Sequence, residues 1–265
     1  MPGLPVLARL DGVGFHNFTK GLKRPYDESM SQCMARTAKY LLDYFKATVV
    51  YTQSDEITLG WLNEDSDVQT KLMFSGKYQK LCSTMAARAS VAFNKELKVY
   101  LPQKIDEDPV FDCRVWQVPT VRLAAENFLW RELDATKNSI TMAASAYYSH
   151  TELHKVSGKE KKDMLIKKGI NWNEYPDFFK KGVYFRKESV QMNLTPAEIS
   201  KIPEKFRPTG PVLRNVVLEI RMPKITSVTN YPEVLFKGQT PIIETQPGVL
   251  NENSKGESLP NSNPD

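Results

Sequence analysis

The segment 47–62, ATVVYTQSDEITLGWL, predicts a β-hairpin with an acidic turn. Two runs rich in β-branched and aromatic residues, ATVVYT and ITLGWL, flank the polar residues Gln53, Ser54, Asp55 and Glu56. Such runs favour strands, and a short polar break between them favours a tight turn. We therefore expect two antiparallel strands that present carboxylates where they meet.

The segments around this hairpin alternate between strand and helix. The predicted order is a buried strand at 6–10, a helix at 27–45 capped by Asp27, the hairpin, a helix at 78–93, and a strand at 111–119 that Pro119 ends. This order is typical of a ferredoxin-like α+β fold. It predicts an antiparallel sheet with helices on one face.

Residues 120–247 predict a helical and β-rich extension of the same domain, and 1–119 its core. Thr120 can cap a long helix running towards Tyr148, and a basic helix is expected between Ser157 and Lys168. The segments GVYFRKESV (182–190) and VVLEIRMPKITSV (216–228) have the composition of strands. Residues 248–265 are polar and poor in apolar side chains, which predicts a disordered tail.

Composition excludes several classes of protein. The chain of 265 residues is 41% hydrophobic, enough for one sizeable core, but has no apolar run long enough to cross a membrane. The N-terminus lacks the basic and apolar regions of a secretory signal, and three widely spaced cysteines argue against a disulfide framework or a zinc site. We expect a cytoplasmic protein. A net charge of +5 permits a polyanionic partner without requiring one.

Carboxylates are expected to gather at one edge of the sheet. If the first strand lies beside the hairpin, then Asp11 at its end comes near Asp55 and Glu56. Carboxylates held together repel each other unless a cation shares them, and an oxygen-only set suits Mg²⁺. Gly12 would let the backbone approach the ion, with its carbonyl as a further ligand. The alternatives are an ordinary Asp-Gly turn and a solvated hairpin tip.

Cationic residues lie near both motifs in the sequence. Three of them, Lys20, Lys23 and Arg24, follow the first strand, while Lys77 and Lys80 begin the second long helix. A triphosphate needs several cationic donors in addition to metal. The alternative is a solvated basic surface. His16 could pair with a phosphate or fill a polar pocket.

Several of these segments resemble the tRNA-His guanylyltransferase family and its Thg1-like relatives. They are RLDGVGFHNFTK (9–20), RPYD (24–27), YTQSDEITL (51–59), FSGKYQKLCSTMAARASVAFN (74–94), FDCRVWQVP (111–119) and, more weakly, GINWNEYPDFFKKGVYF (169–185). The likeness implies a polymerase-type palm that adds nucleotides to the 5′ end of tRNA in the 3′-to-5′ direction. It implies a homo-oligomer, often a tetramer, with ATP and GTP as substrates.

The resemblance also implies roles for individual residues. The catalytic residues would be Asp11, Asp55 and Glu56, with two Mg²⁺ ions held by Asp11, the Gly12 carbonyl and Asp55. The nucleotide-binding residues would be His16, Arg24, Ser54, Lys77 and Lys80. In the implied reaction, ATP activates the 5′-monophosphate of tRNA as an adenylate. The 3′-hydroxyl of GTP then attacks and releases AMP.

One segment departs from the family pattern. Eukaryotic guanylyltransferases carry the motif HINNLYN, where this chain has TKNSITM (136–142). Asn138 and the nearby Arg131 remain as candidate RNA-binding residues, although Arg131 could simply pair with Asp134 within the helix. The departure favours the Thg1-like branch, which repairs truncated tRNA 5′ ends by base pairing. Alternatives are an RNA-binding palm without catalysis and a nucleotide cyclase.

Overall fold

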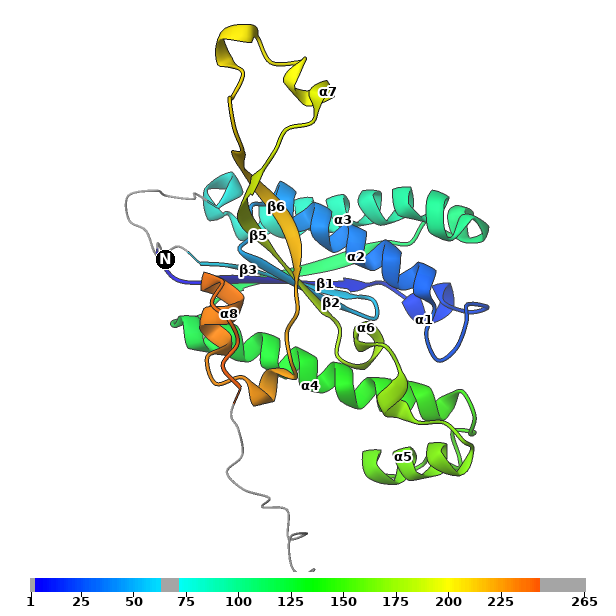
Figure 1. Cartoon of the computed structure of the whole chain (residues 1–265). Helices are drawn as coiled ribbons and strands as arrows, with labels where there is room; N and C mark the ends of the chain where they lie inside the picture. Colours follow the sequence, from blue (N-terminus) through cyan, green and yellow to red (C-terminus); the bar gives the residue numbers. More distant parts are fainter. Residues whose placement is uncertain (1–2, 63–71, 244–265) are drawn as a thin grey trace, which may run out of the picture.

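The computed structural model describes residues 3–62 and 72–243, which form one six-stranded antiparallel sheet with helices on both sides (Figure 1). The strand order is β4-β1-β3-β2-β5-β6. The strands are β1 (Val6–Gly12), β2 (Val49–Gln53), β3 (Glu56–Trp61), β4 (Phe111–Gln117), β5 (Val183–Met192) and β6 (Val212–Ile220). The first four have the ferredoxin-like order, and the predicted α+β class is confirmed.

The helices are α1 (Phe15–Phe18), α2 (Glu28–Tyr44), α3 (Tyr78–Tyr100), α4 (Val121–Ser145), α5 (Gly158–Lys167), α6 (Asp177–Lys180), α7 (Pro196–Ile199) and α8 (Tyr231–Lys237). Side chains cap the first turns of α2, α4, α5 and α7. Asp27 accepts a hydrogen bond from the Met30 backbone N–H, and Thr120 accepts one from Leu123. Both residues thereby satisfy amides that a helix leaves unpaired at its start.

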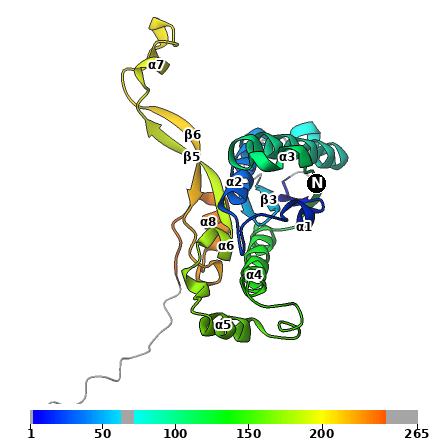
Figure 2. The same cartoon turned by 90° about the vertical axis from the view of Figure 1, so that its right-hand side faces the viewer.

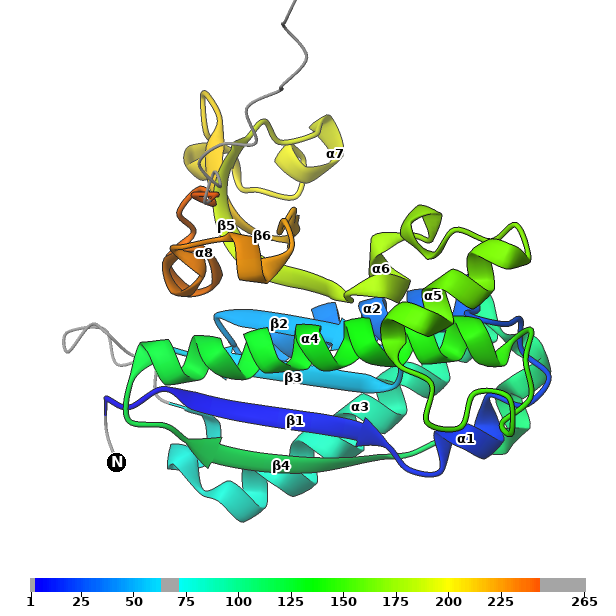
Figure 3. The ribbon, with the colours of Figure 1, turned by 90° about the horizontal axis from the view of Figure 1, so that it is seen from below.

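The expectation that helices cover only one face of the sheet is wrong. Helices α2 and α3 pack on one face, while α4 and α8 pack on the other (Figure 3). Side chains alternate along a strand, so Ala8 and Leu10 enter the first core and Leu7 enters the second. Strand β1 is apolar on both sides over Val6–Ala8, and this pattern is typical of a strand buried between two layers.

Strands β5 and β6 extend away from the body of the protein. Strand β5 pairs with β2 only from Val183 to Arg186 and beyond that pairs with β6 alone. Residues 187–217 project from the body of the protein, and α7 lies near the outer tip of this projection (Figures 1 and 2). The predicted strand at 216–228 stops at Ile220, where the chain turns and the Met222 N–H donates to the Ile220 carbonyl at 2.7 Å.

No helix within residues 3–62 and 72–243 is long and apolar enough to span a membrane. The predicted disordered tail, 248–265, lies outside the described residues.

Candidate active site

The strand register brings Asp11, Gly12 and Asp55 together. In the β1–β3 ladder Asp11 pairs with Glu56, and the Gly12 backbone N–H donates to the Asp55 carbonyl oxygen at 3.1 Å. The hairpin turn consists of Ser54 and Asp55, so Asp55 sits at its tip. Glu56 is the first residue of β3 rather than part of the turn. The expected position of the first strand beside the hairpin is therefore confirmed.

The electrostatics of this pair suit a divalent cation. Burial raises the pKa of Asp55 above its ordinary value, and the nearby charge of Asp11 raises it further. Their carboxylates and the Gly12 carbonyl offer hard oxygen donors, which Mg²⁺ prefers. No group of three or more His, Cys, Asp or Glu side chains within the described residues is placed to hold a metal. A Mg²⁺ ion held here would take further ligands from substrate phosphates or water, as is usual for this ion.

Gly12 is required by close packing as well as by position. A Cβ atom at Gly12 would lie 2.4 Å from the ring of Phe15, closer than side-chain atoms approach. The Phe15 ring also packs against Phe18, Phe93 and Phe111 at centroid distances of 5.1, 5.5 and 5.0 Å. The aromatic cluster thus fixes the chain directly after the Asp-Gly pair.

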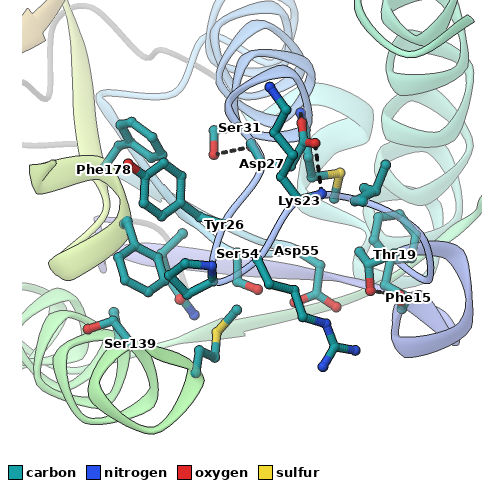
Figure 4. A pocket seen from close by; sticks show the side chains of 18 of the residues that line it. Phe15, Thr19, Lys23, Tyr26, Asp27, Ser31, Ser54, Asp55, Ser139 and Phe178 are labelled. Carbon is teal, nitrogen blue, oxygen red and sulfur yellow. Dashed lines mark hydrogen bonds between the residues drawn. The ribbon is translucent and has the colours of Figure 1, made fainter. Parts of the chain in front are cut away.

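A cavity of about 460 Å³ opens beside the hairpin turn (Figure 4). Four predicted site residues line it: Asp55, Ser54, His16 and Arg24. In Figure 4 Asp55 and Ser54 lie between the helix that carries Ser139 and the loop that carries Lys23. Both His16 and Arg24 are solvent-exposed, so the His16 imidazole and the Arg24 guanidinium are accessible at the cavity.

The cavity has an aromatic wall and a wall of small residues that the sequence analysis did not single out. The Tyr26 ring lies 5.3 Å from the Phe178 ring and 4.9 Å from the Phe179 ring, between centroids, and all three residues line the cavity. Helix α4 contributes Ser139 and Thr141 to the lining. A signal was available for the aromatic wall, since Tyr26 and the two phenylalanines lie in segments that carry the family resemblance.

Glu56 belongs to an ion-pair network behind the carboxylate pair. Its carboxylate contacts the guanidinium of Arg9 and lies 3.1 Å from that of Arg131. Arg9 also lies 3.3 Å from Asp11, and Arg131 lies 2.8 Å from Asp134. Burial raises the pKa of Glu56, whereas both arginines oppose this effect. The network places two fixed positive charges between the acidic residues.

The two candidate RNA-binding residues occupy different environments. The Arg131 side chain is 5% exposed, so its guanidinium serves the ion-pair network rather than the protein surface. The predicted pair with Asp134 is present. Asn138 is exposed, and its amide donates to Asp134 at 3.3 Å.

Lys77 and Lys80 are not brought to the cavity. Helices α2 and α3 run antiparallel, as the contact between Arg36 and Glu96 at 3.8 Å and that between Arg88 and Tyr44 at 2.8 Å show. Helix α3 therefore begins at the end of the sheet opposite the hairpin turn (Figure 3). Both lysines are exposed there, and the Lys80 ammonium lies 5.7 Å from the Phe74 ring centroid.

Known proteins with similar sequence and structure identify the family. A family model described as tRNAHis guanylyltransferase matches residues 1–119. A bacterial tRNA(His) guanylyltransferase (Thg1)-like protein, solved in complex with ATP, is 32% identical with a TM-score of 0.72, and the match covers 89% of this chain and 92% of that one. This chain belongs to the tRNA(His) guanylyltransferase family, which includes the Thg1-like proteins. It is accordingly a nucleotidyltransferase, and the resemblance read from the sequence is confirmed.

Other members of the family agree with this assignment. The tRNA(His) guanylyltransferase of Debaryomyces hansenii is 29% identical over 205 residues, which cover 71% of this chain and 75% of that protein. The Saccharomyces cerevisiae enzyme, at 23% identity, has a TM-score of 0.63 over 76% of this chain and 94% of its own, and so shares the fold. A further bacterial Thg1-like structure, in complex with GTP, is 31% identical over 85% of this chain and 87% of that one, with a TM-score of 0.66.

Proposed function

We propose that this protein extends the 5′ end of tRNA in the 3′-to-5′ direction, using ATP and GTP, and that it repairs truncated 5′ ends under the direction of the opposite strand. The observation that carries the proposal is the pair Asp11 and Asp55. Their segments meet where the Gly12 N–H donates to the Asp55 carbonyl, and Asp55 lines a cavity that Lys23 and Arg24 also line. Carboxylates that face a phosphate-binding space would repel the substrate unless a metal ion lies between them.

The cavity has the size and lining for a nucleotide. Small-molecule sites usually span about 300 to 1,000 Å³, so 460 Å³ is adequate. Arg24 and His16 can donate to phosphate oxygens, and the aromatic wall around Tyr26 offers ring surfaces to a base. The two bacterial relatives solved with ATP and with GTP support nucleotide binding here.

Asp11, Asp55 and the Gly12 carbonyl are the residues that would hold Mg²⁺. Bound there, Mg²⁺ would ease ionisation of an attacking hydroxyl and offset negative charge on the phosphate. The protein residues supply position. The β1–β3 register fixes Asp11, and the bond from the Gly12 N–H to the Asp55 carbonyl fixes the turn that carries Asp55. Glu56 supports the site by holding Arg9, which also contacts Asp11.

Helix α4 supports the templated branch of this function. Its segment 136–142 places Ser139 and Thr141 in the cavity lining, where the eukaryotic motif HINNLYN has larger side chains. Without that motif, selection of the incoming nucleotide falls to base pairing with the opposite strand.

The decisive experiment uses 5′-monophosphorylated tRNA that lacks its first nucleotides. Incubation with ATP and each nucleotide separately should add only the one complementary to the opposite base, and changing that base should change the product. Addition of guanylate regardless of the opposite base would overturn the templated branch. RNA binding without addition would indicate a catalytically lapsed palm, and cyclic product without RNA would indicate a cyclase.

The assembly expected from the family is a homo-oligomer, which we propose to be a tetramer. Light scattering coupled to gel filtration tests it, since the chain mass is 30.2 kDa. A mass near that of one chain would contradict the proposal.

A further inference from the structure

Two lysines, Lys162 and Lys180, lie over the Trp172 ring, next to α4. The Lys162 ammonium lies 3.8 Å from the centroid of the Trp172 ring, and the Lys180 ammonium lies 5.9 Å from the same ring. The charge of Lys224, in the segment after β6, also acts on Lys162. We call Lys162, Lys180 and Lys224 the lysine cluster.

The protein balances the positive charge of this cluster only in part. Asp177 lies 3.4 Å from Lys180, but the same carboxylate also contacts Lys181 at 3.2 Å. Within residues 3–62 and 72–243, no carboxylate lies within 4.0 Å of Lys162 or Lys224. Burial lowers the pKa of Lys162, and the charges of Lys224 and Lys180 lower it further.

A buried acid, Glu132, offsets part of the charge of Lys224. It is 2% exposed, and both of its oxygens already accept hydrogen bonds from other groups. One oxygen accepts from the Tyr184 hydroxyl at 2.9 Å, and the other accepts from the Ile225 backbone N–H at 2.8 Å. Ammonium groups held together in this way are stabilised when an anion from outside shares them.

The cluster is separate from the cavity yet fixed relative to it. Trp172 donates from Nε1 to the Ser139 hydroxyl at 3.3 Å, and Ser139 lines the cavity. Neither Trp172 nor any lysine of the cluster lines the cavity. Helix α5, which carries Lys162, is anchored to α4 because Lys161 donates to Thr141 at 3.1 Å. An anion at the cluster is therefore distinct from a nucleotide in the cavity.

We propose that Lys162, Lys180 and Lys224, together with Trp172, form a contact surface for the phosphate backbone of the RNA substrate. That this RNA is the tRNA substrate rests on the proposed function. Several cations around one aromatic ring suit a nucleic acid strand, because the cations bind phosphates and the ring packs against sugar or base. Trp172 contacts Ser139, and Lys161, next to Lys162, contacts Thr141, so this part of the surface lies beside the C-terminal half of α4 (α4 and α5 in Figure 1).

The test compares two double variants with the same loss of charge. Lys162→Gln/Lys224→Gln removes two cluster cations, whereas Lys95→Gln/Lys98→Gln removes two exposed cations from α3 on the other side of the sheet. The affinity for 5′-monophosphorylated tRNA is measured by anisotropy between about 50 and 200 mM salt, the range over which phosphate contacts dominate. KM for GTP is measured in parallel.

The cluster variant should bind tRNA about tenfold more weakly, with a salt slope lower by roughly 1 for each lysine removed. Its KM for GTP and its Tm should stay unchanged, and Lys162→Arg should retain binding. The α3 variant should bind tRNA like the wild type. Equal tRNA binding and salt slope in the two double variants would overturn the inference. Failure of the proposed function would give a different result. The wild type would then add no nucleotide to the tRNA, regardless of how tightly the variants bind it.

Discussion

The Arg131 guanidinium on α4 lies 3.1 Å from the Glu56 carboxylate on β3. The two side chains are only 5% and 13% exposed, so water screens this ion pair weakly. The contact joins the helix that forms one wall of the cavity to the strand that follows the Asp55 turn. Arg131 therefore sets the distance between those two parts of the site.

Replacing Arg131 by Met should destabilise the protein by about 3 kcal/mol, because it leaves Glu56 buried with one of its two cations removed. Urea unfolding at pH 7 measures the change. The matched control is Arg122→Met on the same helix, whose 81% exposed side chain pairs with Glu126 and should contribute less than about 1 kcal/mol. Equal losses in the two variants would show that Glu56 does not depend on Arg131.

Glu132→Gln should change how stability depends on pH. Burial raises the pKa of Glu132, although hydrogen bonds from Ile225 and Tyr184 oppose the rise. When the pKa of a group is higher in the folded than in the unfolded protein, its protonated form stabilises the fold. This contribution is fully present below the unfolded pKa of about 4.3 and is lost as pH rises through the folded pKa. The variant lacks this loss, and its amide can still accept from the Ile225 N–H.

Between pH 4 and pH 7, the free energy of unfolding of Glu132→Gln should therefore rise relative to that of the wild type. Each unit of pKa difference corresponds to about 1.4 kcal/mol. Urea titrations at several pH values measure the difference. Parallel curves for the two proteins would mean that Glu132 ionises in the fold as easily as in the unfolded chain.

Gly12→Ala should reduce both stability and activity. The new methyl group would meet the Phe15 ring at 2.4 Å, and overpacking of this kind typically costs about 1–3 kcal/mol. The double variant Gly12→Ala/Phe15→Leu should recover part of the stability, because a smaller side chain gives the methyl group room. A double variant no more stable than Gly12→Ala would indicate that another contact excludes the methyl group.

Asp55→Asn should remove the response to magnesium without unfolding the protein. For the wild type, MgCl₂ with GTP should raise Tm, because ligands that bind only the folded state stabilise it. Asp55→Asn should keep or raise the metal-free Tm, since its amide is not repelled by Asp11, but should show little rise with MgCl₂ and GTP. Glu126→Gln, on the exposed side of α4, is the control and should respond like the wild type.

Local patterns predicted the carboxylate pair well. The β-branched runs around the hairpin and the apolar strand before Asp11 are short-range signals, and strand order follows from their sequence. Gly12 and Asp55 lie far apart in sequence, but the ferredoxin-like order of the elements already implied that their segments meet. Caps at Asp27 and Thr120 marked helix starts for the same reason.

Features that depend on packing between distant segments were not predictable in this way. The pairing of Arg131 with Glu56 joins residues 75 apart, and the helical pattern alone indicated only its pair with Asp134. Lys77 and Lys80 follow the site motifs in sequence, but the direction of α3 places them at the far end of the sheet. The aromatic wall requires Tyr26 to meet Phe178 on α6, a contact that no local spacing encodes.

Strand β5 pairs with the outer edge of β2 and so keeps β2 from being an exposed edge strand. Residues 1–119 contain the carboxylate pair but end before β5 and α4, so that fragment would leave the backbone donors and acceptors of Val49–Gln53 open on one side. It would also uncover Leu7 and Tyr51 on the face that α4 and α8 cover. Exposed edge strands beside an apolar surface promote pairing between molecules. The isolated fragment 1–119 should therefore aggregate, and restoring residues 183–186 should reduce the aggregation by covering the edge of β2.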